Sequence, residues 1–287
     1  MTNLFPSKRF PSLSKDDASV KAASTCPTYY LLSRREKYVW GLKPSPRQGS
    51  LKWPDVFCDT FKAIRKRLGI PDPDEERPGM VAESRSDDSD LCHDMLSKYG
   101  FTEEQMHRAA ERFRLGCSKS GKAIYWMIDD LGRVYDGHIG TTWVSNLLKL
   151  RYPENAKYIQ TNICFFGLHQ ISSVDLGGSE SEGRTIGIVE SERSAVILSE
   201  VYPSLLWLAH VTKFMFIDRF EPLQGRTVTL FPRTDTNGEY YWAALDLADR
   251  VKRSYKTIDI HVSSFLEDHA TDSQKSRQID LVDYLFE

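Results

Sequence analysis

The sequence has no run of 18 apolar residues, and its opening stretch, MTNLFPSKRFPSLSKDD, has no apolar block followed by small residues. The first absence argues against a membrane-spanning helix, and the second argues against a secretory leader. We therefore expect a cytoplasmic protein that has no membrane partner.

Cysteines are few and widely scattered. The chain has five, with no CxxC pair and no cluster of His and Cys at the spacing of a zinc site. We expect reduced thiols and no zinc. Cys92 and His93 could form half of a metal site, but because no second pair accompanies them, a structural role is favoured.

Charge is unevenly distributed along the chain. Residues 1–70 contain 14 Lys/Arg and five Asp/Glu, a net of +9, and since the whole chain carries −2, the remainder carries −11. Tyr and Trp residues alternate with these bases, which is typical of surfaces that pair with phosphates and stack on bases. A solvated basic face is the equally weighted alternative. The nucleic-acid contacts we expect are Arg34, Arg35, Lys37, Arg65, Lys66 and Arg67.

Four regions are expected along the chain. Residues 1–70 form the basic N-terminal region, which ends in an amphipathic helix from Trp53 to Leu68. Residues 71–95 are rich in acids and prolines, and this composition predicts a linker. Residues 96–165 are predicted to be a small α+β region. It contains a capped helix at TEEQMHRAAERFRLG, a hairpin at KAIYWMIDDLGRVYDGHIG and a short helix at TTWVSNLLKLRY.

Residues 166–287 predict an α/β domain. The apolar stretches RTIGIVES, LLWLAH, RTVTLFP and TIDIHVS are strands separated by helical patterns, one of them around KFMFIDRF. Nearly continuous apolar strands that alternate with helices indicate a parallel sheet covered on both faces. A site is then expected at the carboxyl ends of the strands, where Glu190 and the PRTD stretch lie.

Two stretches, IGIVESERSAVILSEVYP and GRTVTLFPRTDTNGEYYWAALDLADRV, are spaced like the glutamate and DxD motifs of a Toprim domain, which they resemble. Toprim is the small α/β catalytic fold of primases, topoisomerases and related nucleases. The stretches ERFRLGCSKSGKAIYWMIDDLGRVYDGHIG, WVSNLLK, ICFFGLHQI and DLVDYL add a resemblance to primase-like proteins of mobile elements and phages in Bacteroidetes-type bacteria. Together the resemblance covers roughly residues 108–287.

The resemblance implies roles for particular residues. Glu190 matches the general acid/base glutamate, and Asp235 is the one residue that fills the DxD pattern; Asp235, together with Glu239, is expected to hold Mg²⁺. An acid in the first turn of a helix is the alternative for Glu190, and a turn-forming residue is the alternative for Asp235. Asp280 and Asp283 resemble the acidic segment that closes such domains, or lie on the exposed side of a helix.

Arg233 departs from the Toprim pattern, because it stands where the first aspartate of the DxD motif is expected. A guanidinium stays charged and opposes a divalent ion at short range. We predict that Arg233 pairs with Glu190 or Asp235 and substitutes for the metal.

The resemblance and this departure leave three functions open. The chain is predicted to be a primase-like protein that binds single-stranded DNA, has degenerate nucleotidyl-transfer activity and serves replication or mobilisation of a mobile element. A replication or helicase protein is an expected partner. The alternatives are an active Mg²⁺-dependent primase and a protein-interaction module without a nucleic-acid partner.

Overall fold

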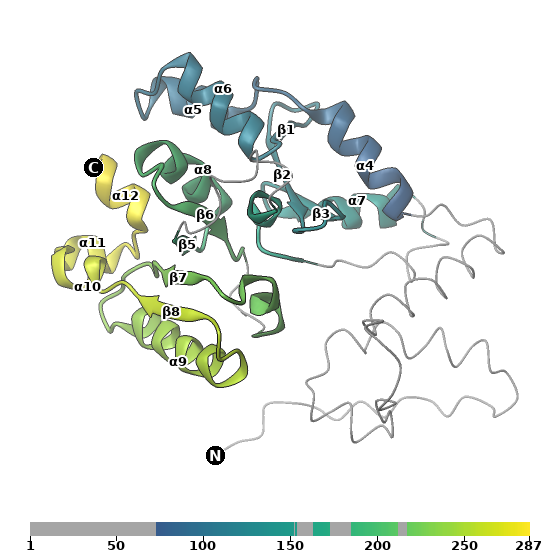
Figure 1. Cartoon of the computed structure of the whole chain (residues 1–287). Helices are drawn as coiled ribbons and strands as arrows, with labels where there is room; N and C mark the ends of the chain where they lie inside the picture. Colours follow the sequence, from purple (N-terminus) through teal and green to yellow (C-terminus); the bar gives the residue numbers. More distant parts are fainter. Residues whose placement is uncertain (1–72, 152, 154–162, 173–184, 212–216) are drawn as a thin grey trace, which may run out of the picture. The chain divides into compact units, whose positions relative to one another are not determined.

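The computed structural model describes residues 73–151, 153, 163–172, 185–211 and 217–287 (Figure 1). The chain divides into two units, Met1–Asp72 and Pro73–Glu287, and all described residues belong to the second. The helix expected from Trp53 to Leu68 and the predicted basic contacts lie outside the described residues. Within the described part, no helix is both long and apolar enough to cross a bilayer.

The linker expected at residues 71–95 differs from the structure. Helix α4 spans Pro73–Ser84 and helix α5 spans Asp90–Ser97. The side chains of Leu91, Cys92 and Met95 are buried. The acidic composition was misleading because a few apolar residues on one face of α5 suffice to pack it against the rest of the unit.

The first sheet is antiparallel and has the strand order β1-β2-β3-β4. Its strands are Gly116–Cys117, Ala123–Ile128, Val134–Ile139 and Thr142–Trp143. The predicted hairpin is confirmed. Asp129 makes its turn, because Oδ1 accepts hydrogen bonds from the backbone N–H groups of Leu131 (3.0 Å) and Arg133 (2.8 Å).

Helices α6 and α7 flank this sheet in the sequence. Helix α6 spans Glu103–Arg112 and begins with the predicted capping box between Thr102 and Gln105. Helix α7 spans Val144–Arg151, as the pattern predicted. Within the 3₁₀ helix η2, Leu168–Ile171, all four side chains are buried.

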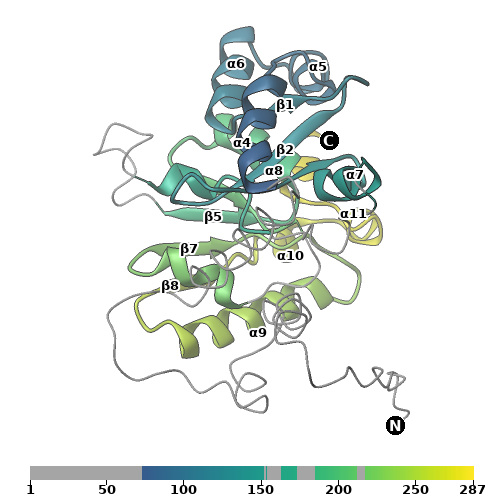
Figure 2. The same ribbon diagram turned by 90° about the vertical axis from the view of Figure 1, so that its right-hand side faces the viewer.

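The second sheet is wholly parallel and has the order β6-β5-β7-β8 (Figures 1 and 2). Its strands, Ile186–Val189 (β5), Leu206–Ala209 (β6), Thr227–Leu230 (β7) and Asp259–Val262 (β8), are the four that the sequence predicts. Gly187 on β5 is required by close packing, since an added Cβ would lie 2.7 Å from the Trp207 ring. The α/β prediction is confirmed.

Helices connect the parallel strands. Helix α8, Glu192–Val201, joins β5 to β6, and α9, Glu239–Ser254, joins β7 to β8. Between β6 and β7, the described part of the helix expected around KFMFIDRF is the 3₁₀ helix η3, Ile217–Leu223, which contains Pro222. Because the chain moves in opposite directions from β5 to β6 and from β7 to β8, right-handed crossovers place α8 and α9 on opposite faces.

Three short helices end the chain. They are α10 (Phe265–His269), α11 (Asp272–Ser276) and α12 (Leu281–Phe286). Asp280 is the N-cap of α12, and it forms a capping box with Asp283. Neither predicted alternative for these two acids included this role, which fixes where the last helix begins.

The two predicted domains, 96–165 and 166–287, share one hydrophobic core. Met127 on β2 belongs to the same cluster as Phe113, Phe166 and the strands of the parallel sheet. Ile124, Trp126 and Ile128 point to the other face of β2 and form a second cluster with Val144 and other residues. Strand β2 is therefore buried on both faces, and residues 73–287 form one compact unit.

An ion-pair network around a buried glutamate also joins the halves of this unit. The side chain of Glu200 on α8 is 2% exposed, and its carboxylate accepts hydrogen bonds from Arg108 (2.6 Å) and Arg112 (2.7 Å) on α6. Removal of one partner of a buried pair leaves an uncompensated charge, so this network holds α6 on α8.

Candidate functional site

The central feature of the site is a reversal of strand order between β5 and β7. From β5 the chain moves outward to β6 and then crosses back to β7, which lies on the other side of β5. In open α/β sheets, the crevice at such a reversal, beyond the carboxyl ends of the strands, is the usual ligand site. Glu190 follows β5 and Arg233 lies beyond the end of β7, so both residues border this crevice.

Arg233 and Glu190 form an ion pair. Nε of Arg233 donates a hydrogen bond of 2.6 Å to Oε2 of Glu190, and both side chains are largely buried. The guanidinium also lies 5.3 Å from the centre of the Tyr240 ring, within cation–π range. The pairing expected between Arg233 and a carboxylate is thus present, and its partner is Glu190.

Burial and neighbouring charges act on the pKa of Glu190 in opposite directions. Burial raises the pKa of this carboxyl above its ordinary value, Arg233 opposes the rise, and the negative charge of Asp280 adds to it. A carboxyl group with a raised pKa is a better proton acceptor than an ordinary one, which suits general acid/base chemistry.

Asp235 is used by the backbone that leads into α9. Its Oδ1 accepts hydrogen bonds from the N–H groups of Asn237 (2.8 Å) and Glu239 (3.2 Å), and its Oδ2 accepts one from Tyr240 (3.0 Å). Burial alone would raise the pKa of Asp235, but these backbone hydrogen bonds outweigh it and lower the pKa. The turn-forming alternative therefore describes the contacts of Asp235, and its metal role remains a prediction.

Glu239 lies at the first position of α9, where its side chain is exposed. Its Oε1 accepts a hydrogen bond of 3.4 Å from the Asn237 amide. A carboxylate in the first turn is favoured by the helix dipole, so this position has a local structural explanation.

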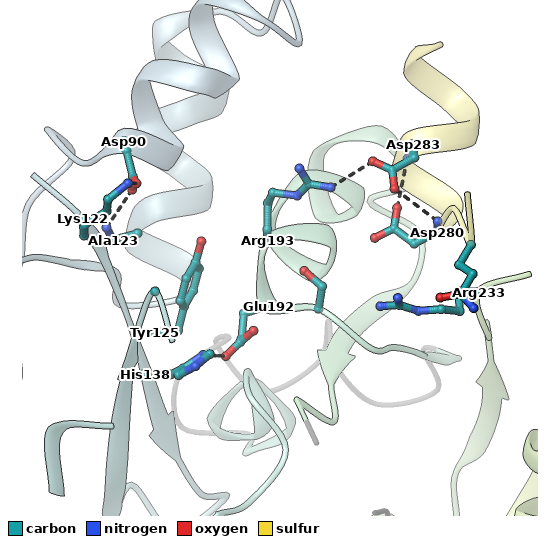
Figure 3. A pocket seen from close by; sticks show the side chains of 13 residues that line it. Asp90, Lys122, Ala123, Tyr125, His138, Glu192, Arg193, Arg233, Asp280 and Asp283 are labelled. Carbon is teal, nitrogen blue, oxygen red and sulfur yellow. Dashed lines mark hydrogen bonds and ion pairs between the residues drawn. The ribbon is translucent and has the colours of Figure 1, made fainter. Parts of the chain in front are cut away.

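A cleft of about 380 Å³ opens beside the Arg233–Glu190 pair (Figure 3). One side consists of residues from α5 and the antiparallel sheet, among them Lys122, Tyr125 and His138. The other side carries Arg233, Asp280 and Asp283, and Arg193 at the start of α8 lies between them. Asp235 and Glu239 are not among its lining residues.

His138 and Glu192 join the antiparallel sheet, on one side of the cleft, to α8. Nδ1 of His138 on β3 lies within hydrogen-bond distance, 2.6 Å, of Oε1 of Glu192 on α8. The imidazole also stacks on Trp143 with a ring-centre distance of 4.6 Å. Burial raises the pKa of the neighbouring Tyr125 hydroxyl, so this phenol stays neutral.

Two further ion pairs complete the lining. Nζ of Lys122 lies 3.0 Å from Oδ2 of Asp90, whose Oδ1 accepts a hydrogen bond from the Ala123 N–H (2.8 Å). Nη2 of Arg193 lies 3.0 Å from Oδ1 of Asp283. Each cation that lines the cleft is therefore paired with a carboxylate.

The carboxylates near the sheet edge do not fit Mg²⁺ as they stand. Glu190 is neutralised by Arg233, and both oxygens of Asp235 accept backbone hydrogen bonds. Over the described residues, no three His, Cys, Asp or Glu side chains are arranged to hold a metal ion. A Toprim-type metal would need Arg233 to move and the turn at Asp235 to open.

The sequence pattern did not identify Lys122, His138, Glu192 or Arg193 as site residues. Lys122, just before β2, and His138, on β3, are more than 50 residues away from α8 in the sequence, so nothing local indicates that they meet there. One signal was present, because His138 is a polar residue on a strand of the hairpin, between Gly137 and Ile139.

Residues 90–234, just over half of the chain, match a family described as "Domain of unknown function (DUF6371)". A search of curated proteins finds no match. The structure is similar to the DnaG primase catalytic domain bound to single-stranded DNA (14% identity, TM-score 0.43), over 68% of this chain and 74% of that one. It is also similar to the catalytic core of E. coli primase (14% identity, TM-score 0.41), over 72% and 80% of the two chains.

Proposed function

Because the chain belongs to the DUF6371 family, whose description assigns no activity, we propose a function from its own residues. The protein is a primase-like Toprim protein that binds single-stranded nucleic acid and has lost efficient metal-dependent nucleotidyl transfer. Its place is the replication or mobilisation of a mobile element in the cytoplasm, beside a replication or helicase protein. The resemblance of the sequence to primase-like proteins of mobile elements supports this role.

The observation that carries the proposal is the ion pair between Arg233 and Glu190 at the reversal of strand order. The guanidinium stands where the Toprim pattern has an aspartate, and it lies 2.6 Å from the glutamate that the pattern assigns to acid/base chemistry. A fixed positive charge at this distance competes with a divalent ion for the same carboxylate. The parallel sheet and a cleft at its edge are present, while the residues expected to hold Mg²⁺ depart from the Toprim pattern at Arg233.

Affinity for nucleic acid is supported by charge. The net charge of +9 in residues 1–70 provides phosphate contacts at Arg34, Arg35, Lys37 and the Arg65–Arg67 run. Because the remainder of the chain carries −11, binding concentrates on residues 1–70 and on local groups of cations.

One observation favours an active Mg²⁺-dependent enzyme as the second candidate. The pKa of Glu190 is raised by burial, as a general acid/base requires. In such an enzyme, Arg233 would move away when metal and substrate bind, and the Glu190 carboxylate would then be free to transfer a proton. The inactive protein and the active enzyme would have the same residues at this site and would differ only in whether Arg233 leaves Glu190.

The test combines binding with primer synthesis on a single-stranded template. We expect binding to a labelled oligonucleotide that weakens steeply with salt, and no primer synthesis in Mg²⁺ or Mn²⁺. Template-dependent synthesis that is lost in Glu190→Gln would establish the active enzyme instead. Absence of binding at low salt would contradict both and favour a protein-interaction module.

A further inference from the structure

We propose that Arg193 and Arg233 form a phosphate-binding pair in the cleft, with Lys122 on the opposite side, and that Glu190 acts as a built-in competitor for this site. The ligand is the sugar–phosphate backbone of a single strand. This inference rests on the proposed function for the identity of the ligand. The site itself is argued from the hydrogen bonds around the cleft.

The two guanidinium groups retain unused donors. A guanidinium has five N–H donors, and each of these groups has one side-chain hydrogen bond to a carboxylate. Within the described residues, no hydrogen bond is formed by Nη1 or Nη2 of Arg233, or by Nε or Nη1 of Arg193. Both side chains line the cleft and are about one-third exposed, so a ligand can reach these donors.

The carboxylates around the cleft, in contrast, already accept hydrogen bonds from the protein. Asp280 accepts from the Ser194 hydroxyl (2.5 Å) and from the Asp283 N–H (2.9 Å). The remaining carboxylates are engaged in the ion pairs of the cleft: Asp90, Glu190, Glu192 and Asp283. Each of these carboxylates therefore accepts at least one hydrogen bond from the protein, whereas several guanidinium N–H groups donate none, and such unused donors suit a ligand rich in acceptor oxygens.

A phosphodiester meets these conditions better than a carboxylate or a neutral ligand. Its non-bridging oxygens match the planar fork of a guanidinium, and charge-assisted hydrogen bonds of this kind are among the strongest in proteins. The cleft has a volume of about 380 Å³, which is in the range of small-molecule sites and can hold a short piece of single-stranded nucleic acid. Tyr125 adds an aromatic ring to the lining.

Glu190 limits the affinity of this site. Its carboxylate lies 2.6 Å from Nε of Arg233 and offers the guanidinium the same kind of partner as a phosphate oxygen. A phosphate that approaches the free Nη donors therefore meets a neighbouring negative charge. Glu190→Gln replaces this carboxylate with a neutral amide of nearly the same shape, so it should strengthen the binding of phosphate ligands.

The experiment measures anisotropy of a fluorescein-labelled oligothymidylate of about 12 nucleotides with the full chain. We expect Arg193→Gln and Arg233→Gln to weaken binding by about 3- to 10-fold each, and to lower the slope of log Kd against log salt by about 0.7 for each phosphate that is no longer neutralised. Glu190→Gln should strengthen binding by a similar factor. The controls are Arg250→Gln and Asp249→Asn on α9, where both residues are exposed and the charge changes are the same.

Thermal unfolding of every variant, together with Arg193→Lys and Arg233→Lys, separates loss of the site from loss of the fold. If the arginine variants bind like the Arg250→Gln control, the phosphate site is wrong although nucleic-acid binding stands. Inorganic tripolyphosphate is the second probe. Weaker tripolyphosphate binding by the two arginine variants supports the site even where the oligonucleotide does not bind, and binding of neither probe by the wild type overturns both proposals.

Discussion

His138 on β3 and Glu192 on α8 are 54 residues apart in the sequence, and their side chains meet at 2.6 Å in the lining of the cleft. Both side chains are mostly buried, and no other ion pair between the cleft-lining residues joins the antiparallel sheet to α8. The pair therefore holds the antiparallel sheet to the start of α8, which lies between the two sides of the cleft.

A double-mutant cycle measures this pair. We expect Glu192→Ala and His138→Ala each to reduce the free energy of unfolding, with a coupling energy of about 0.5–3 kcal/mol because the two side chains are in direct contact. Urea denaturation of the four proteins gives the coupling. A value below about 0.3 kcal/mol would mean that the two sites are independent and that the contact does not hold the cleft.

Replacement of Arg233 tests what keeps metal away from the sheet edge. Arg233→Asp removes the competing cation and adds a carboxylate beside Glu190, so Mg²⁺ affinity should rise by roughly tenfold or more, about 1.4 kcal/mol or more. Isothermal titration calorimetry on the wild type and the variant gives the comparison. Arg250→Asp is the matched control, and an equal gain there would show a general effect of charge.

Asp235 is predicted to stabilise the fold through the turn before α9. Asp235→Ala should lower the free energy of unfolding by about 1–2 kcal/mol, because three backbone N–H groups lose their acceptor. Asp235→Asn keeps one acceptor oxygen and should cost less. Chemical denaturation at neutral pH compares these two variants, and Asp249→Asn controls for the change in charge.

The contribution of Asp235 should also depend on pH. Its pKa is lower in the folded protein than the ordinary value of 3.8, so the unfolded chain binds the proton more readily. The stabilisation is therefore fully present above the unfolded pKa and is lost as pH falls through the folded pKa. The difference in unfolding free energy between wild type and Asp235→Asn should shrink in this acidic range, and a constant difference would contradict the assignment.

Charge reversal in the N-terminal region tests the other source of affinity. Replacement of Arg65, Lys66 and Arg67 by Glu should weaken binding to oligonucleotides of all sequences alike, because phosphate contacts carry no sequence information. Anisotropy at two salt concentrations measures the loss of affinity and the change in salt slope. Unchanged binding at low salt would mean that these residues form a solvated face.

Local patterns were enough to predict the parallel sheet and the capped helix α6. The four strands are short apolar runs between helical patterns, and Thr102 and Gln105 have the spacing of a capping box. The site was harder to predict. Glu190 and Arg233 could be placed near each other from the strand ends, whereas Lys122 and His138 reach the cleft through tertiary packing between sheets, which has no local sequence pattern.

Asp235 and Asp280 show that a match to a sequence motif does not by itself define what a residue does. Asp235 resembles a residue of the DxD motif and Asp280 resembles the acidic segment that closes Toprim domains, yet Asp235 accepts hydrogen bonds from N–H groups in the first turn of α9 and Asp280 is the N-cap of α12. Aspartate serves either purpose, and only the direction of the neighbouring N–H groups distinguishes them.

The burial of β2 on both faces has a consequence for cooperativity. A strand that contributes Met127 to one cluster and Trp126 to the other cannot separate from either without exposing a large apolar surface. Residues 73–287 should therefore unfold in a single transition, and a fragment that begins at residue 166 should not fold by itself. The two sides of the cleft therefore form and unfold together, because both belong to one folding unit.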